Sequence, residues 1–164
     1  MSGVLQGKLT GTRGETDMNY EEFIAYRRKA VPLLAEDVKS FYSDRFPAEA
    51  PFFKLNQNNV SVRLTSSRID QNQRTDLYLR IQAQKDGRVK LVIARIAFSE
   101  QRAGHGTALI EHIARIAPRL GFECLEIESV NDESRAFAIR LGMHEHEHDC
   151  YIADVQTLQQ VSSK

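Results

Sequence analysis

LVIARIAF at residues 91–98, followed by QRAGHG at residues 101–106, is the stretch of sequence that decides the fold. Nearly every residue of the first segment is apolar, which is typical of a central strand that is covered on both faces of a sheet. The second segment carries Gly104 and Gly106 and leads into a helical pattern that begins near Thr107. Together they predict a buried strand, a tight turn and a helix in immediate succession.

A glycine-bearing turn that leads into a helix can bind an anion. The first backbone N–H groups of a helix have no partner inside the helix, and the helix dipole adds partial positive charge there. A glycine has no Cβ, so an anion can come close to its backbone. The turn is therefore a candidate site for phosphate or pyrophosphate. Taken alone, a Q-x-x-G-x-G pattern is short enough to recur by chance.

The apolar periodicity on either side of this stretch predicts the remaining elements. We expect a short helix from Asn19 to about Ala30, a break at Pro32, and a second helix to about Arg45. Asp86-Gly87 predicts a hairpin turn of the primed type between two neighbouring strands. The predicted strands are 60–64, 77–83, 89–98 and 122–130, followed by two short strands or one bent hairpin within 143–155. The later helices are 107–120, closed by Gly121, and 132–141, ended by Gly142.

This order predicts one α/β (α+β) domain with a mixed, mostly antiparallel central sheet flanked by helices on both faces. Its 164 residues suit a single core. We expect a flexible, glycine-containing leader over residues 1–17, the domain over residues 18–158, and a short polar tail over residues 159–164. Translation from Met1 and from Met18 are both left open by the sequence.

Composition excludes several classes of protein. Lys+Arg and Asp+Glu are both 22, so the net charge of zero argues against a general nucleic-acid binder. No apolar run approaches the ~20 residues of a membrane span, and the N-terminus lacks the apolar core of a signal peptide. Two cysteines, Cys124 and Cys150, make no disulfide framework. We therefore expect a cytoplasmic protein with no membrane partner.

A second block follows one strand later, NDESRAFAIRLGM at residues 131–143. With Gln101, Gly104 and Gly106 in the first block, and Asn131, Ser134 and Leu141-Gly142 in the second, the chain resembles the GNAT superfamily of acetyl-CoA-dependent N-acyltransferases. The resemblance covers about residues 89–155. Met143 stands where that family usually has Phe.

The resemblance implies acetyl-CoA as co-substrate and an amine acceptor, which could be a small molecule, a peptide, a protein or a charged tRNA. Homodimers are common in the family. Backbone amides of the turn would hold the pyrophosphate, the exposed backbone at the end of the central strand would pair with the pantetheine arm, and a backbone N–H there would stabilise the oxyanion. The implied coenzyme-binding residues are Ile96, Ala97, Phe98, Gln101, Arg102, Ala103, Gly104, His105, Gly106, Thr107, Asn131 and Ser134.

The general acid and the general base that are usual in this family are less well matched by the residues of this chain. Many relatives carry a Tyr at the position of Ala138, where it protonates the departing thiolate. Tyr151, in the last hairpin, is a candidate substitute for this acid. Glu128 is a candidate base for the acceptor amine, with a salt-bridged surface carboxylate as the alternative interpretation. Binding of acyl-CoA without catalysis is therefore the alternative to N-acetyl transfer.

The residues argue against a metal site and against a dinucleotide-binding fold. His144, His146 and His148 share one face of a strand, but residues two apart on a strand lie ~6.6 Å from each other, which is too far for all three to hold one ion easily. We therefore predict no metal site. A dinucleotide-binding fold is disfavoured because no third glycine follows Gly106 at the required spacing. Cys124 is expected to be buried rather than to act as a nucleophile.

Overall fold

The computed structural model describes residues 18–67, 74–100, 103–128 and 131–162. The predicted leader, Gln101 and Arg102 lie outside the described residues. The elements are α1 (Tyr20–Arg45), the 3-10 helix η1 (Ala50–Phe52), β1 (Phe53–Gln57), β2 (Ser61–Ser66), β3 (Asp76–Ala83), β4 (Val89–Ala97), α2 (His105–Leu120), β5 (Cys124–Ile127), α3 (Asp132–Arg140), β6 (His144–Glu147), β7 (Cys150–Asp154) and α4 (Val155–Ser162).

The strands form one sheet in the order β1-β2-β3-β4-β5-β7-β6. Every neighbouring pair is antiparallel except β4 and β5, which are parallel and are joined by the crossover helix α2. A parallel pair needs such a crossover, because its second strand must start at the same end of the sheet as the first. The predicted fold class, a mixed and mostly antiparallel sheet with helices packed on it, is confirmed.

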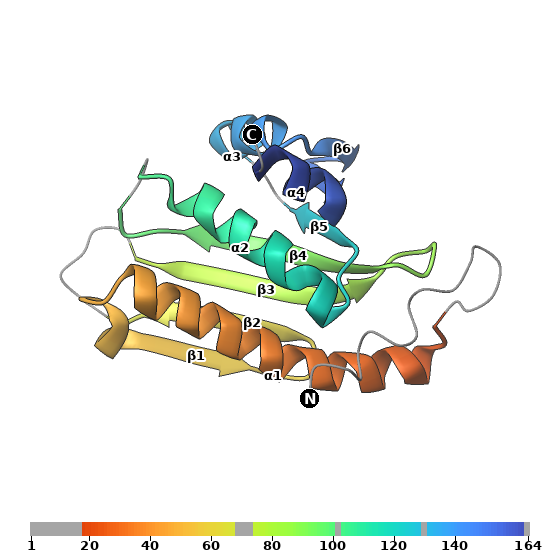
Figure 1. The fold of residues 1–164 in the computed structure, drawn as a ribbon, viewed down its shortest axis with the longest axis horizontal. Helices are drawn as coiled ribbons and strands as arrows, with labels where there is room; N and C mark the ends of the chain where they lie inside the picture. The colour runs from red at the N-terminus through yellow and green to blue at the C-terminus, as the bar shows by residue number, and fades with distance from the viewer. Residues whose placement is uncertain (1–17, 68–73, 101–102, 129–130, 163–164) are drawn as a thin grey trace.

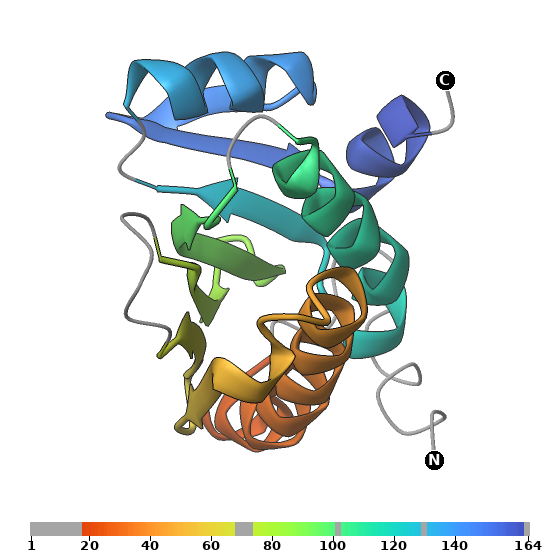
Figure 2. The ribbon, with the colours of Figure 1, turned by 90° about the vertical axis from the view of Figure 1, so that its left-hand side faces the viewer.

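The helices are distributed unevenly around the sheet. Figures 1 and 2 show α1, α2 and α4 together on one face, with α2 in the middle, and α3 beyond them at the β6–β7 end. The seven apolar residues that gave α2 its helical pattern, from Leu109 to Leu120, are all buried. Leu91 and Ile93 of β4 join them in the core. The opposite face carries ion pairs instead, among them Arg63 with Asp76 and Lys90 with Glu126.

The break predicted at Pro32 is wrong. A single helix of 26 residues runs from Tyr20 to Arg45 with Pro32 in its interior. Proline there removes one backbone hydrogen bond, which is normally enough to end a helix. On either side of it, Ala30, Val31, Leu34 and Ala35 are fully or almost fully buried against the sheet. Tertiary packing of this apolar face therefore overrides the local preference.

Two elements were not predicted, and one turn differs. Strand β1 lies at the sheet edge and is only partly buried, and its alternating pattern is limited to Phe53 and Leu55, which are half-buried between exposed residues. Helix α4 follows β7 without a connecting loop and buries Val155 and Leu158. In the β3–β4 hairpin only Gly87 has a positive φ, of 84°. A primed type I turn needs two such residues, so the predicted turn type is wrong.

Candidate functional site

The pairing between the parallel strands β4 and β5 stops before β4 ends. Their pairing runs from Lys90 opposite Cys124 to Ile93 opposite Ile127, and the N–H of Glu128 donates to the carbonyl oxygen of Ile93 at 3.2 Å. Strand β4 continues to Ala97, beyond the end of β5. On its other side, the register with β3 shifts between Tyr78 and Leu79, which leaves Ala94 as an extra residue in β4. A bulge of this kind bends a strand, and among the described residues β4 has no pairing with β5 beyond Ile93.

A cavity of about 710 Å³ lies at the end of β4 and between the N-terminal ends of α2 and α3. Nine of the predicted coenzyme-binding residues line it: Ile96, Ala97, Phe98, Gly104, His105, Gly106, Thr107, Asn131 and Ser134. Ala103 is described but does not line it, and Gln101 and Arg102 are outside the described residues. The fold thus brings two blocks of sequence, about 30 residues apart, to one hollow surface.

Four further lining residues were not predicted: Glu100, Glu133, Phe137 and Arg140. The last three are spaced four and three residues apart on α3, so they share one face of this helix. The spacing itself can be read from the sequence. The direction in which this face of α3 points, toward the start of α2, depends on how the two helices pack.

The turn before α2 has the geometry of an open cradle. Gly104, the N-cap, has a φ of 77°, and a Cβ placed on it would meet no atom within 4 Å. The first helical hydrogen bond is from Ala108 N–H to Gly104 O at 3.0 Å. The N–H groups of His105, Gly106 and Thr107 precede this bond and therefore have no acceptor within the helix. All three residues line the cavity, where these N–H groups are free of helical hydrogen bonds.

Gly106 has a different role from Gly104. A Cβ on Gly106 would lie 3.2 Å from Cζ of Phe137, which is tighter than ordinary van der Waals contact. The absence of a side chain therefore lets α3 approach the N-terminus of α2 closely. The two glycines of the turn serve two needs, an open backbone at Gly104 and helix packing at Gly106.

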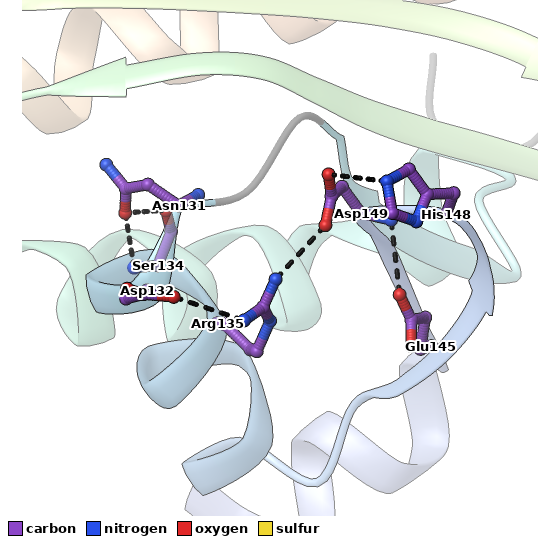
Figure 3. A network of polar contacts seen from close by, with 7 residues as sticks. All are labelled: Asn131, Asp132, Ser134, Arg135, Glu145, His148 and Asp149. Atoms are coloured by element: carbon purple, nitrogen blue, oxygen red, sulfur yellow. Dashed lines mark hydrogen bonds and ion pairs between the residues drawn. The ribbon is translucent and has the colours of Figure 1, made fainter.

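Asn131 and Ser134 form the N-terminal capping box of α3. Asn131 Oδ1 accepts hydrogen bonds from Ser134 N at 2.9 Å and from Ser134 Oγ at 2.7 Å, and Ser134 Oγ accepts from Asn131 N at 3.1 Å. Such a box satisfies backbone donors that the first turn of a helix leaves free. Figure 3 shows the side-chain amide nitrogen of Asn131 turned away from Ser134. Capping uses the oxygen of Asn131 and leaves its N–H₂ group as a donor at the cavity.

His105 is held by contacts on several sides. Arg45 Nε donates to its Nδ1 at 2.7 Å, and its Nε2 lies 3.6 Å from a carboxylate oxygen of Glu100. Its ring lies 4.6 Å from the ring of Phe46 and 5.5 Å from that of Phe98, between centroids. The side chain was predicted as a coenzyme contact, with packing beneath the turn as the alternative. The structure shows both packing and a place in the cavity lining.

The proposed acid and base lie outside the cavity lining. Glu128 forms an ion pair with Arg80 on the polar face of the sheet, as the alternative interpretation of this carboxylate expected. Tyr151 is buried on β7 and belongs to the core. Ala138 is fully buried and has no proton to give. Among the described residues, the cavity is lined by no tyrosine, cysteine or lysine.

The histidine-rich hairpin is organised around carboxylates. His146 Nε2 lies 2.6 Å from Glu126, and His148 Nε2 lies 3.2 Å from Asp149. Ligand atoms of Glu145, His148 and Asp149 lie within 4.8 Å of one another. However, Arg135 donates to Asp149 Oδ1 at 3.1 Å and to Asp132 Oδ1 at the same distance (Figure 3). The carboxylate of Asp149 is therefore already paired with a guanidinium. The network ties α3 to the β6–β7 turn.

Cys124 is 1% exposed, and burial raises the pKa of its thiol to about 12. It therefore stays protonated at neutral pH, and only the thiolate is a good nucleophile. The expectation that Cys124 is buried is confirmed. Among the described residues, no helix combines the length and apolar character that crossing a membrane requires.

No protein-family model matches this chain, and no curated protein matches it. Among solved structures, the KacTA–DNA complex has a chain with 17% identity and a TM-score of 0.47, aligned over 78% of this chain and 85% of that one. The DNA-bound AtaT–AtaR complex gives 17% identity and 0.48, over 64% and 74%. AtaTR bound with acetyl-CoA gives 14% identity and 0.45, over 74% and 76%. At these identities and TM-scores, the chain is similar to these structures only in the broad arrangement of its elements.

Proposed function

We propose that this protein binds acetyl-coenzyme A in the cavity between β4, α2 and α3 and transfers its acetyl group to an amine. One observation carries the proposal: the end of β4, which pairs with β3 but, among the described residues, not with β5, lines the same cavity as the open N-terminus of α2. An extended arm with amide groups can pair with a free strand edge, and a pyrophosphate suits a helix N-terminus. Few ligands combine these two chemical features.

The residues present fit such a ligand in most respects. Gly104 leaves space above the turn, and His105, Gly106 and Thr107 offer backbone donors beside it. Asn131 offers an amide N–H₂ group at the opposite wall. The cavity also carries the carboxylates of Glu100 and Glu133, which repel a polyanion. Positive charge from neighbouring side chains is therefore required, and Arg140 supplies part of it.

When bound, acetyl-coenzyme A would supply a thioester whose carbonyl carbon an uncharged amine attacks. The C–N bond forms, the C–S bond breaks, and the amine loses a proton. Backbone N–H groups at the bent end of β4 can stabilise the oxyanion. Glu128, at the far end of the β4–β5 pairing, is our candidate for receiving the proton through water, and Tyr151 is our candidate for protonating the thiolate.

A coenzyme-binding protein without turnover is the second candidate function. The burial of Ala138 and the ion pair of Glu128 with Arg80 favour it, because Ala138 has no proton to give and Glu128 is engaged outside the cavity lining described. A coenzyme thiolate is nevertheless a fair leaving group at neutral pH, so catalysis without a general acid is slower rather than excluded.

Titration calorimetry with acetyl-coenzyme A tests the shared part of both functions, and we expect a 1:1 complex. No heat of binding at millimolar ligand would overturn the coenzyme site. Release of free thiol in the presence of amines, peptides or aminoacyl-tRNA then separates the two functions. Binding without thiol release above the protein-free rate across that panel would reject the transferase and leave the binding protein.

A further inference from the structure

The described lining of the cavity is short of positive charge. It contains the carboxylates of Glu100 and Glu133 and the single guanidinium of Arg140. The ligand proposed above carries a pyrophosphate and a 3′-phosphate, so its charge is strongly negative. Backbone N–H groups hold only partial charges, and phosphates in proteins are normally met by arginine or lysine as well. A further cation near the turn is therefore expected.

Arg45 brings such a cation to the turn from a distant part of the chain. It is the last residue of α1, 60 residues before His105, and its Nε donates to His105 Nδ1 at 2.7 Å. His105 is the first residue of α2 and lines the cavity. The guanidinium thus lies one side chain away from the unpaired backbone donors of the turn.

The imidazole of His105 is fixed in orientation. Its ring packs against Phe46 at 4.6 Å and Phe98 at 5.5 Å, between centroids. Because Nδ1 accepts from Arg45, the proton of the neutral ring is on Nε2, which faces Glu100 at 3.6 Å. A ring held by packing on two phenylalanines and by the hydrogen bond at Nδ1 is a rigid support for the arginine that it binds.

Most of the hydrogen-bonding capacity of Arg45 is unused. Within the described part of the chain, its contacts are His105 and the ring of Phe41, whose centroid lies 6.0 Å from Cζ. A guanidinium has several N–H donors in a planar fork, and only the Nε donor is engaged here. The two terminal nitrogens remain available for an anion, and this fork matches the geometry of phosphate oxygens.

We propose that Arg45 is a phosphate-binding residue of this cavity and that His105 is the residue that positions it. The inference rests on the proposed coenzyme site and extends it: one phosphate of the nucleotide is bound by the end of α1, through a contact that the turn motif does not contain. The ligand-binding surface then includes three helices rather than two.

Calorimetry on Arg45→Ala, Arg45→Lys and His105→Phe tests this, with Arg28→Ala as matched control. Arg28 is an exposed arginine on the same helix, about 25 Å along its axis from Arg45. We expect Arg45→Ala to weaken acetyl-coenzyme A binding about tenfold, as for loss of one charge-assisted contact, and Arg45→Lys to restore part of it. His105→Phe keeps an aromatic ring but loses the acceptor for Arg45. Its affinity for acetyl-coenzyme A should fall as far as that of Arg45→Ala, and the double variant should lose no more affinity than either single variant.

Salt dependence separates a phosphate contact from a structural role. The slope of log Kd against log salt concentration should be smaller for Arg45→Ala than for the wild type, because one ionic contact is missing. An affinity loss with an unchanged slope would overturn the inference. Dephospho-coenzyme A identifies the phosphate: a persistent effect of Arg45→Ala assigns the pyrophosphate, and a lost effect assigns the 3′-phosphate.

The same measurements distinguish the coenzyme site from the role of Arg45. If the wild type binds acetyl-coenzyme A and Arg45→Ala binds as Arg28→Ala does, the role of Arg45 is rejected and the coenzyme site stands. If the wild type does not bind the coenzyme, the proposed function is rejected and the role of Arg45 is rejected with it.

Discussion

At the scale of single residues, Gly104 is the position where the backbone itself is the functional group. Its φ of 77° belongs to the left-handed region, and the space above it is empty within 4 Å. A side chain there would enter the cavity and not the core. Gly121, at the other end of α2, has a φ of 85° but lies away from the cavity lining. The two glycines share a conformation and differ in surroundings.

We predict that Gly104→Glu weakens acetyl-coenzyme A binding by more than about tenfold, because its carboxylate occupies the place proposed for the pyrophosphate. Gly142→Glu, at another exposed glycine with a positive φ, of 81°, that lies outside the cavity lining, imposes the same backbone strain and is the control. Both variants should lose similar thermal stability, while only the first loses affinity in calorimetry. Equal affinity of Gly104→Glu and the wild type would show that the turn does not hold the ligand.

His112 provides a pH dependence of stability. Burial, followed by the charge of Arg115, lowers the pKa of His112, although Asp37 acts in the opposite direction. The unfolded chain therefore binds a proton on His112 at a higher pH than the folded protein does. Between the unfolded pKa of about 6.5 and the lower folded pKa, the free energy of unfolding falls as the pH falls.

We predict that His112→Phe, which keeps a ring against Phe41, reduces this part of the pH dependence. Urea unfolding at about pH 7.5 and about pH 5.5 measures it. The difference in unfolding free energy between the two pH values should be smaller in the variant. An unchanged difference would mean that His112 has the same proton affinity in both states.

At the scale of elements, α1 is a helix that local preference alone would have broken. Pro32 lies in its interior with an exposed side chain, while the residues around it are held in the core. The missing N–H leaves the carbonyl of Arg28 without its helical partner. The sequence-based break at Pro32 was reasonable from propensity and was wrong because burial of the apolar face outweighs one lost hydrogen bond.

We predict that Pro32→Ala raises the free energy of unfolding by about 1–3 kcal/mol, since alanine restores the hydrogen bond and removes a steric conflict. Thermal or urea denaturation measures the gain. Pro47→Ala, in the loop after α1, is the control and should give no gain, because there is no helical bond to restore. A loss of stability in Pro32→Ala would show that the proline contributes to packing.

At the scale of the whole molecule, the cavity joins segments that are otherwise weakly connected. The end of β4 and the start of α2 supply one wall, and α3 supplies the other. Helix α3 is held by the network of Arg135 with Asp132 and Asp149 and by the contact of Phe137 with the turn. A ligand that bridges these walls binds only to the folded protein and therefore stabilises it.

We predict that acetyl-coenzyme A raises the melting temperature by several degrees, which corresponds to about 2.7 kcal/mol at a ligand concentration of about 100 times Kd. Differential scanning calorimetry measures the shift. Gly104→Glu, whose affinity is predicted to fall by more than about tenfold, should show a clearly smaller shift at the same ligand concentration, corresponding to about 1.4 kcal/mol or less. An equal shift in both proteins would place the ligand elsewhere on the molecule.

The sequence by itself determined the parts of this protein whose causes are local. The apolar run of β4, the periodicity of α2 with its closing glycine, and the short helix α3 all depend on residues within a few positions of one another, and each is present as predicted. Nine residues of the cavity lining were expected from the family resemblance, which rests on two short blocks of sequence, the turn before α2 and the start of α3.

Only the tertiary structure decided what these pieces enclose. Three contacts join residues that are from about 30 to 60 positions apart in the sequence: the limited pairing of β4 with β5, the approach of Phe137 to Gly106, and the hydrogen bond between Arg45 and His105. Such contacts depend on how α1, α2 and α3 pack on one sheet, and no periodicity records that packing. The same reason explains β1 and the unbroken α1, since pairing and burial, not propensity, hold both in place.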